Sequence, residues 1–272
     1  MPSQSETTVD APIETKEPAL PGVDLLDYLL FVPFVLAFVG ILLVMEVVQR
    51  LALLFGAKAH RITVRWLNQL LLACLHIVGT KIEIKAQGLG DSGKPYIIVS
   101  NHQSLFDIPL LYCIFARHDP RFIAKKELGR NIPSVSLNLR HGGGALIDRN
   151  NPRQALPEIK KLGVKLIDEK FAAALFPEGT RAKRGLLKEF HHAGLASLLA
   201  SAPGVDIIPV AIDGAWKLAG RKFGPIPRGI EVKVRVLPIV TPDANGGSKA
   251  TREISEKLRA EIGQALIEMR AE

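Results

Sequence analysis

A histidine and an aspartate stand close together in the stretch VSNHQSLFDIPL, between two apolar runs. His102 and Asp107 are five positions apart. On one continuous helix that spacing would place them about 140° apart around the axis and about 7.5 Å apart along it, a poor geometry for contact. We therefore expect His102 on a strand-to-helix turn and Asp107 in the first turn of the helix, where its carboxylate can bind one ring nitrogen. The other ring nitrogen would then be free to act as a general base.

Other interpretations of this pair remain open. A lone His–Asp pair is usually structural or a surface contact. A triad with Ser104 would have to align three side chains from within six residues, so we favour the substrate's own hydroxyl as the nucleophile. A metal site is disfavoured because no further histidine or carboxylate stands at ligand spacing nearby, and His191 and His192 could join only through folding.

The motif FPEGTR follows an apolar run and could bind an anion. Gly179 lets a ligand approach the backbone, and Arg181 offers a fork of donors suited to phosphate. Glu178 can hold a hydroxyl or orient the arginine, with Thr180 between them. Taken alone, a Glu–Arg pair in a turn is most often a solvated ion pair.

Three further cations precede this motif in the chain. Arg149 follows Asp148 at the end of GGGALIDR and is also of the phosphate-binding type, although a salt bridge to Asp148 is at least as common an outcome. Lys125 and Lys126 in FIAKKEL add positive charge that could line the same cleft, or they form an exposed surface pair.

Strand-like and helix-like segments alternate from about residue 80, which predicts an α/β domain with a mostly parallel sheet flanked by helices. In such sheets, sites collect beyond the carboxyl ends of the strands, so the polar clusters should share one cleft. The expected strands fall within 80–88, 96–101, 121–128, 142–149, 171–176, 205–214 and 229–240, and the expected helices within 107–115, 152–169, 193–202 and 248–270.

The segment before this domain favours association with a membrane. Residues 1–22 are polar and should be disordered. Residues 23–79 contain 18 uncharged residues between Asp27 and Glu46, at the short end for a membrane span and interrupted by Pro33 and Gly40. An amphipathic stretch with Trp66 follows, so the two segments could form a helical hairpin that spans the bilayer or dips into it. Helices packed on the globular domain remain an alternative.

The net charge and the cysteine content restrict the possible binding partners and the cellular compartment of the protein. The formal net charge of +8 favours anionic partners, and nucleic acid is disfavoured because none of the common binding motifs appears. Basic residues cluster after the apolar segment, which would leave residues 80–272 on the cytoplasmic side of a cytoplasmic (inner) membrane. Cys74 and Cys113 lie in apolar stretches and are typical of buried thiols in a reducing compartment.

Four segments in order carry a resemblance to a known family: NHQSLFD, ALIDRNN, FPEGTR and IIPVAI. They resemble the four blocks of the glycerolphosphate acyltransferase superfamily, over roughly residues 80–240. The short length and the KKEL segment look most like the bacterial 1-acylglycerol-3-phosphate (lysophosphatidic acid) acyltransferases. One departure is EFHHAGLA, where His191 stands at a position that is often lysine in relatives.

The resemblance implies a role for each matching residue. His102 would be the general base and Asp107 its orienting partner. The glycerol phosphate would be bound by Arg149 and the third block, and a pocket for the acyl chain would be shaped by residues 207–212. The implied substrate-binding residues are Arg149, Glu178, Gly179, Thr180 and Arg181, with Lys125 and Lys126 as weaker candidates.

Residues and resemblance together predict acyl transfer to the 2-hydroxyl of lysophosphatidic acid, giving phosphatidic acid. The donor would be a thioester of coenzyme A or of acyl carrier protein, and backbone N–H groups at the turn before the helix would stabilise the oxyanion. No metal or other cofactor is expected. Transfer to another lyso-lipid, a membrane-anchored binding protein and a metal-dependent hydrolase are the alternatives.

Overall fold

The computed structural model describes residues 18–221, 224–244 and 246–272. The predicted disordered tail, residues 1–22, lies mostly outside the described residues. The helices are α1 (Leu25–Leu54), α2 (Ala57–Ala73), α3 (Asp107–Ile114), α4 (Val135–His141), α5 (Pro152–Glu169), α6 (His192–Ser201) and α7 (Gly247–Ala271). The strands are β1 (Lys81–Ala86), β2 (Tyr96–Ser100), β3 (Arg121–Lys125), β4 (Ala145–Ile147), β5 (Ala172–Leu175), β6 (Ile207–Asp213) and β7 (Glu231–Val236).

The described strands form one sheet of seven in the order β1-β7-β6-β2-β5-β3-β4. Every neighbouring pair is parallel except β6 and β7, which are antiparallel. The prediction of a mostly parallel sheet flanked by helices is therefore confirmed. Because β2, β4 and β5 run in the same direction, the loops that follow them meet at one edge of the sheet.

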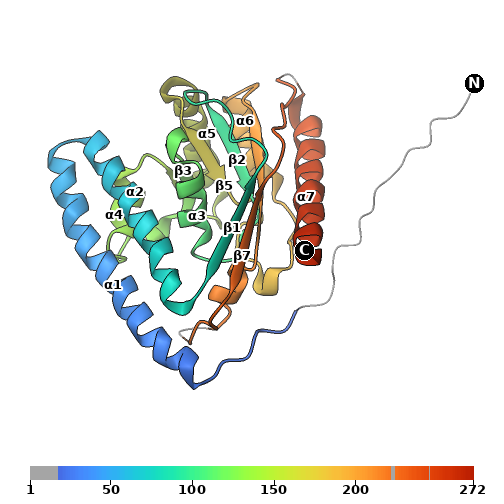
Figure 1. Cartoon of the computed structure of the whole chain (residues 1–272). Helices are drawn as coiled ribbons and strands as arrows, with labels where there is room; N and C mark the ends of the chain where they lie inside the picture. The colour runs from blue at the N-terminus through green and yellow to red at the C-terminus, as the bar shows by residue number, and fades with distance from the viewer. Residues whose placement is uncertain (1–17, 222–223, 245) are drawn as a thin grey trace, which may run out of the picture.

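Helices cover both faces of the sheet (Figure 1). The central strands supply side chains to each face in turn. Ile98 packs in a core shared with α1, α2 and α3. Its neighbours Ile97 and Val99 pack in a second core, shared with α5, α6 and α7. This alternation follows from the two-residue repeat of a strand and explains why β2 is apolar on both faces.

Helix α1 is anchored to the domain at its first turn. Asp24 caps the helix by accepting from the Leu26 and Asp27 amides, and Asp27 accepts in return from the Asp24 amide at 2.8 Å. The buried Asp27 also accepts at 2.8 Å from the backbone N–H of Arg228, on the segment that leads into β7. The helix then continues through Pro33, so the interruption suggested by that proline is absent.

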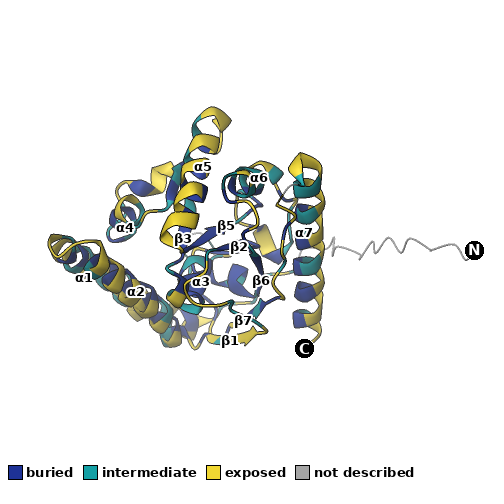
Figure 2. Cartoon of the chain, turned by 90° about the horizontal axis from the view of Figure 1, so that it is seen from above, coloured by how far each residue is buried: buried dark blue, intermediate teal, exposed yellow. Residues whose placement is uncertain are grey.

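Helices α1 and α2 form the predicted hairpin, with Gly56 at the turn in a left-handed conformation (φ 93°). By length and composition, α1 is apolar enough to cross a membrane, and only 17% of its most apolar window is buried. Its inner side meets the sheet through Phe34. Figure 2 shows the opposite side of the hairpin as a mostly exposed surface.

Candidate active site

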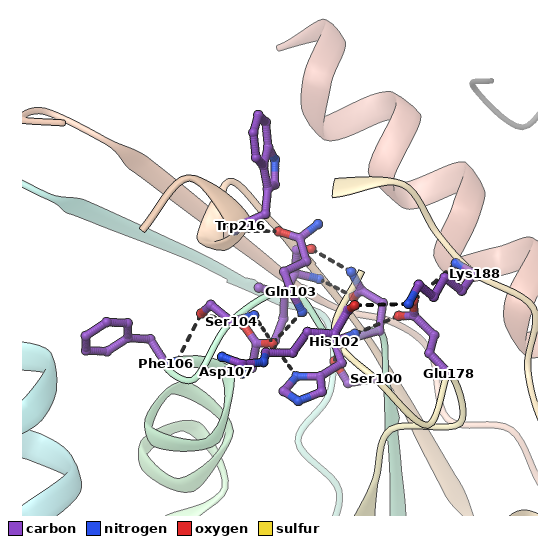
Figure 3. A network of polar contacts seen from close by, with 12 residues as sticks. Ser100, His102, Gln103, Ser104, Phe106, Asp107, Glu178, Lys188 and Trp216 are labelled. Carbon is purple, nitrogen blue, oxygen red and sulfur yellow. Dashed lines mark hydrogen bonds and ion pairs between the residues drawn. The ribbon is translucent and has the colours of Figure 1, made fainter. Parts of the chain in front are cut away.

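The imidazole of His102 and the carboxylate of Asp107 are in contact. Nδ1 of His102 lies 2.7 Å from Oδ2 of Asp107 (Figure 3). His102 follows β2 on a turn and Asp107 is the first residue of α3, so the predicted strand-to-helix geometry is present. With Nδ1–H donating to the carboxylate, the Nε2 atom is left as the proton acceptor.

Asp107 is fully buried and its oxygens are occupied by the turn that precedes it. Oδ2 accepts from the Gln103 amide at 2.6 Å and from the Ser104 amide at 2.8 Å. The hydroxyl of Ser104 donates to Oδ1 at 3.2 Å and accepts from the Phe106 amide at 3.0 Å. The expectation that amides of this turn stabilise an oxyanion is wrong for Gln103, Ser104 and Phe106, because each already has a partner. Ser104 supports the turn through its hydrogen bonds to Asp107 and Phe106.

Phe176 holds the histidine ring from the other side. The rings of His102 and Phe176 are stacked, with centroids 4.1 Å apart and planes inclined by 17°. Sequence reasoning missed this residue, although it is the first letter of FPEGTR. The histidine is thus fixed by one hydrogen bond and one aromatic face, which limits the rotation of the imidazole.

Glu178 lies behind the histidine and is only 2% exposed. Oε1 accepts from the backbone N–H of His102 at 2.7 Å, and Oε2 accepts from the backbone N–H of Lys188 at 3.1 Å (Figure 3). Burial raises the pKa of Glu178 to about 7, against the opposing effect of these two amides. With both oxygens engaged, Glu178 acts as a brace for the His102 backbone.

Asn101 fastens the same turn to the neighbouring strand. Its side-chain amide donates to the carbonyl of Ile212 at 2.8 Å, and its side-chain oxygen accepts from the Ile212 amide at 2.8 Å. The side chain therefore extends the β2–β6 ladder by one pair where β2 ends. This contact fixes the direction in which the chain leaves the strand toward His102.

A cavity of about 390 Å³ opens beside this centre, and Phe176 forms part of its wall. Its apolar lining comes from α5, α6 and the strands β3, β4 and β5. Four of the predicted site residues line this cavity, and Asn150 and His191 line it with them. The four predicted residues are Arg149, Glu178, Gly179 and Thr180.

Gly179 occupies a position that requires glycine on two grounds. Its φ is +68°, a left-handed conformation that other residues seldom adopt. A Cβ atom there would lie 3.1 Å from Cδ2 of His191, which is tight for a carbon contact. The backbone of FPEGTR thus packs closely against His191 where both residues line the cavity.

The four predicted cations differ in whether they line the cavity. Arg149 lines the cavity. Partial burial lowers the pKa of its guanidinium, the charge of Glu127 raises this pKa, and the charge of Arg181 lowers it. Arg181 is exposed on the following loop and does not line this cavity. Lys126 is paired with Asp148 at 2.7 Å and Lys125 with Glu127 at 3.6 Å. Neither lysine lines the cavity.

The fourth block, Ile207–Ile212, belongs to β6 in the interior of the sheet, and the whole segment is buried. None of these residues lines the cavity described above, so the acyl pocket that the resemblance places around Pro209 stays a prediction. The block supplies the backbone partner of Asn101.

Within the described part of the chain, no group of three or more His, Cys, Asp or Glu side chains is placed to hold a metal ion.

The fold and the site lie in a segment of the chain that identifies the class of protein. A protein-family model for acyltransferases matches residues 76–213, half of the chain, and this segment contains His102, Asp107 and the cavity. The chain therefore belongs to the acyltransferase family.

The names of individual relatives specify a reaction more closely than the family does. The chain is 28% identical over 197 residues to the 1-acyl-sn-glycerol-3-phosphate acyltransferase of Saccharomyces cerevisiae, covering 71% of this chain and 64% of that enzyme. It is 26% identical to the enzyme of the same name from Pseudomonas aeruginosa, covering 79% and 80%. A crystal structure of the 1-acyl-sn-glycerophosphate (LPA) acyltransferase from Thermotoga maritima superposes with a TM-score of 0.67 at 26% identity, over 90% of this chain and 97% of that one.

Proposed function

We propose that the protein transfers a fatty acyl group from an acyl thioester to the 2-hydroxyl of 1-acylglycerol-3-phosphate, forming phosphatidic acid. The observation that carries the proposal is the buried His102–Asp107 contact of 2.7 Å at the end of β2. The names of the relatives support this choice of acceptor.

The geometry suggests the order of proton and acyl transfer. Nε2 of His102 takes the proton of the acceptor hydroxyl, and the hydroxyl oxygen attacks the thioester carbonyl. Asp107 stabilises the imidazolium that forms, because its carboxylate is dry and already oriented. Collapse of the tetrahedral intermediate breaks the carbon–sulfur bond, and the imidazolium returns its proton to the departing thiolate.

We assign the phosphate of the acceptor to the polar mouth of the cavity. Arg149 provides a planar donor pair for it, and Arg181 adds positive charge from the adjoining loop. Gly179 and Thr180 form the backbone and hydroxyl surface between them. Glu178 contributes indirectly, by bracing His102. Lys125 and Lys126 remain weaker candidates for electrostatic attraction of the substrate.

We also propose that residues 23–79 associate with the membrane and that residues 80–272 work on its cytoplasmic side. The exposed apolar surface of α1 and α2 supports the first part. The excess of Lys and Arg after α1 supports the second. The acceptor and the product are lipids, so a site held at the bilayer surface would meet both.

The test is acyl transfer by the purified protein in detergent, with labelled acyl-CoA or acyl carrier protein as donor. Lysophosphatidic acid, lysophosphatidylcholine and glycerol-3-phosphate would be offered as acceptors. We expect phosphatidic acid as the main product. His102→Ala should lower kcat by about 10²- to 10⁴-fold, the usual contribution of a general base.

Asp107→Asn should also lower kcat strongly, because the neutral amide no longer stabilises the imidazolium. Its melting temperature is to be compared with that of the wild type, since Asp107 also holds the turn. The exposed His76→Ala variant is the matched control and should retain full activity. Transfer to another acceptor only, or undiminished activity of His102→Ala, would refute the proposal.

A further inference from the structure

The last turn of α7 carries an arginine that reaches the candidate active site from outside the family segment. Met269 of α7 is buried in the core shared with α5 and α6. The next residue, Arg270, is therefore held at the end of a packed helix, and its side chain is mostly buried. The matching acyltransferase model ends at residue 213, so α7 lies beyond the segment that identifies the family.

The guanidinium of Arg270 joins two loops that are distant in the sequence. Nη2 donates to Oδ1 of Asp213, the last residue of β6, at 2.9 Å, and Nε donates to Oδ2 of the same residue at 3.2 Å. Nη2 also donates to the backbone carbonyl of Gly185 at 2.7 Å. A planar guanidinium can serve a carboxylate and a carbonyl at once, because its donors are fixed in a fork. We call these contacts of Arg270 with Asp213 and Gly185 the Arg270 clamp.

The contact with Asp213 continues to the turn that holds Asp107. The side-chain amide of Gln103 donates to Oδ1 of Asp213 at 3.3 Å. The backbone N–H of the same Gln103 donates at 2.6 Å to Oδ2 of Asp107, the oxygen that contacts His102 (Figure 3). This path therefore links the end of α7 to the His102–Asp107 pair.

The contact with Gly185 continues to the backbone of His102. Gly185 lies in a loop between Ala182 and Lys188. The Ala182 amide donates to the carbonyl of His102 at 2.6 Å. The Lys188 amide donates at 3.1 Å to Glu178, which accepts from the His102 amide at 2.7 Å. Both polar groups of the His102 backbone are thus held by contacts that involve this loop.

Trp216 keeps the two paths side by side. A Cβ atom at Gly185, whose φ is +75°, would lie 2.6 Å from Nε1 of Trp216 and 3.1 Å from Nη2 of Arg270. The loop therefore passes too close to both side chains for any residue but glycine. The backbone N–H of Trp216 donates to the side-chain oxygen of Gln103 at 3.3 Å, as Figure 3 shows. The same tryptophan thus contacts the loop and the turn.

We propose that Arg270 is a positioning residue for the His102–Asp107 pair. The Arg270 clamp fixes, relative to each other, the loop and the turn that hold the histidine. The inference rests on the proposed function, because it takes His102 as the base. Arg270 does not line the cavity beside His102. Loss of the clamp should therefore disturb catalysis more than it disturbs the binding of substrate.

The test compares acyl transfer by the wild type, Arg270→Ala, Arg270→Lys and the control Arg235→Ala, all as full chains in detergent. The control also removes an arginine that ties the sheet to the end of α7. Arg235 of β7 pairs with Glu272 at 2.7 Å and with Glu268, and its side chain is 12% exposed. It therefore matches Arg270 in charge, burial and attachment of α7.

We expect Arg270→Ala to lower kcat by about 10- to 100-fold with KM for lysophosphatidic acid unchanged, because a displacement of about 1 Å can cost about 10²-fold in rate. Arg270→Lys should recover part of this loss, since the ammonium keeps a positive charge beside Asp213. Arg235→Ala should keep the kcat of the wild type. Equal losses of kcat in Arg270→Ala and Arg235→Ala would overturn the assignment, because any weakening of α7 would then slow the reaction.

A double-variant cycle with Gln103→Ala separates the clamp from a general loss of stability. If Arg270 acts through Gln103, the variant Gln103→Ala/Arg270→Ala should lose less kcat than the product of the two single losses. The losses should multiply in Gln103→Ala/Arg235→Ala. Losses that multiply in both pairs would overturn the path from Arg270 to Gln103.

Hydrogen exchange of backbone amides gives a readout that does not depend on turnover. The amides of Gln103, Ala182 and Lys188 should exchange faster in Arg270→Ala than in Arg235→Ala, because the clamp holds their segments. Unchanged exchange in Arg270→Ala would overturn the clamp, even if the wild type forms phosphatidic acid. Faster exchange, with no acyl transfer by the wild type to any acceptor, would support the clamp and refute the proposed reaction.

Discussion

At the scale of single residues, Glu178 is the least expected participant. Sequence reasoning placed its carboxylate against the substrate, whereas both oxygens accept backbone amides. The His102–Asp107 contact could be anticipated, because only a turn lets residues five apart meet. The role of Glu178 could not be anticipated from the sequence, because only the fold brings its partners His102 and Lys188 to it.

The raised pKa of Glu178 predicts a specific dependence of stability on pH. Its folded pKa of about 7 exceeds the ordinary value of 4.5, so its stabilising contribution is complete below pH 4.5 and is lost as the pH rises through 7. The full loss would be about 3 kcal/mol. Relative to Glu178→Gln, the wild type should therefore lose unfolding free energy between pH 5 and 8.

Denaturant unfolding in detergent at several pH values measures this difference. Glu189→Gln is the matched control, because Glu189 lies on the same loop with an exposed carboxylate. Its difference from the wild type should stay nearly constant with pH. If the unfolding free energies of the wild type and Glu178→Gln change with pH in the same way, Glu178 keeps an ordinary pKa in the folded protein.

At the scale of elements, local patterns predicted each described strand of the domain and the helices α3, α5, α6 and α7, but they missed the short helix α4. Pro33 and Pro157 both lie inside long helices, α1 and α5, although proline removes a backbone donor. Packing of the helix faces on the sheet outweighs that cost. The order of the strands in the sheet could not be predicted from the sequence either, because β1 pairs with β7, which is distant in the sequence.

The anchor at the start of α1 gives a prediction about stability. Asp27→Ala removes the acceptor of the Asp24 and Arg228 amides. We expect a loss of about 1–2 kcal/mol, the usual range for a helix cap and a buried hydrogen bond. The measurement is denaturant unfolding in detergent.

Asp91→Ala serves as its control, since that carboxylate is exposed and pairs with Lys94 on the surface. Its effect should remain within about 0.5 kcal/mol. If Asp27→Ala is equally mild, α1 does not depend on this anchor and is held by its apolar contacts alone.

At the scale of the whole molecule, most of the exposed large apolar side chains of the described residues lie on the α1–α2 hairpin. Leu54 and Phe55 at its turn are 80% and 81% exposed. The double variant Leu54→Glu/Phe55→Glu should bind phospholipid vesicles at least about tenfold more weakly, because each side chain contributes on the order of 1.5–3 kcal/mol when buried in an apolar phase. Co-sedimentation with vesicles measures this.

The control is Val164→Glu/Ile167→Glu, which changes two exposed apolar residues on the outer side of α5. Its vesicle binding should equal that of the wild type. Acyl transfer to lysophosphatidic acid in vesicles should fall with binding in the hairpin variant. Both variants binding alike would locate the membrane contact elsewhere than on the α1–α2 turn.

The side chain of Asn101 has a consequence for how the protein ages. Spontaneous deamidation of asparagine requires the next backbone nitrogen to attack the side-chain carbonyl carbon. Here the side chain is held at both ends by Ile212, and the His102 nitrogen donates to Glu178. The attacking and attacked groups are thus held apart, and the residue beside His102 should remain an amide during long storage of the folded protein.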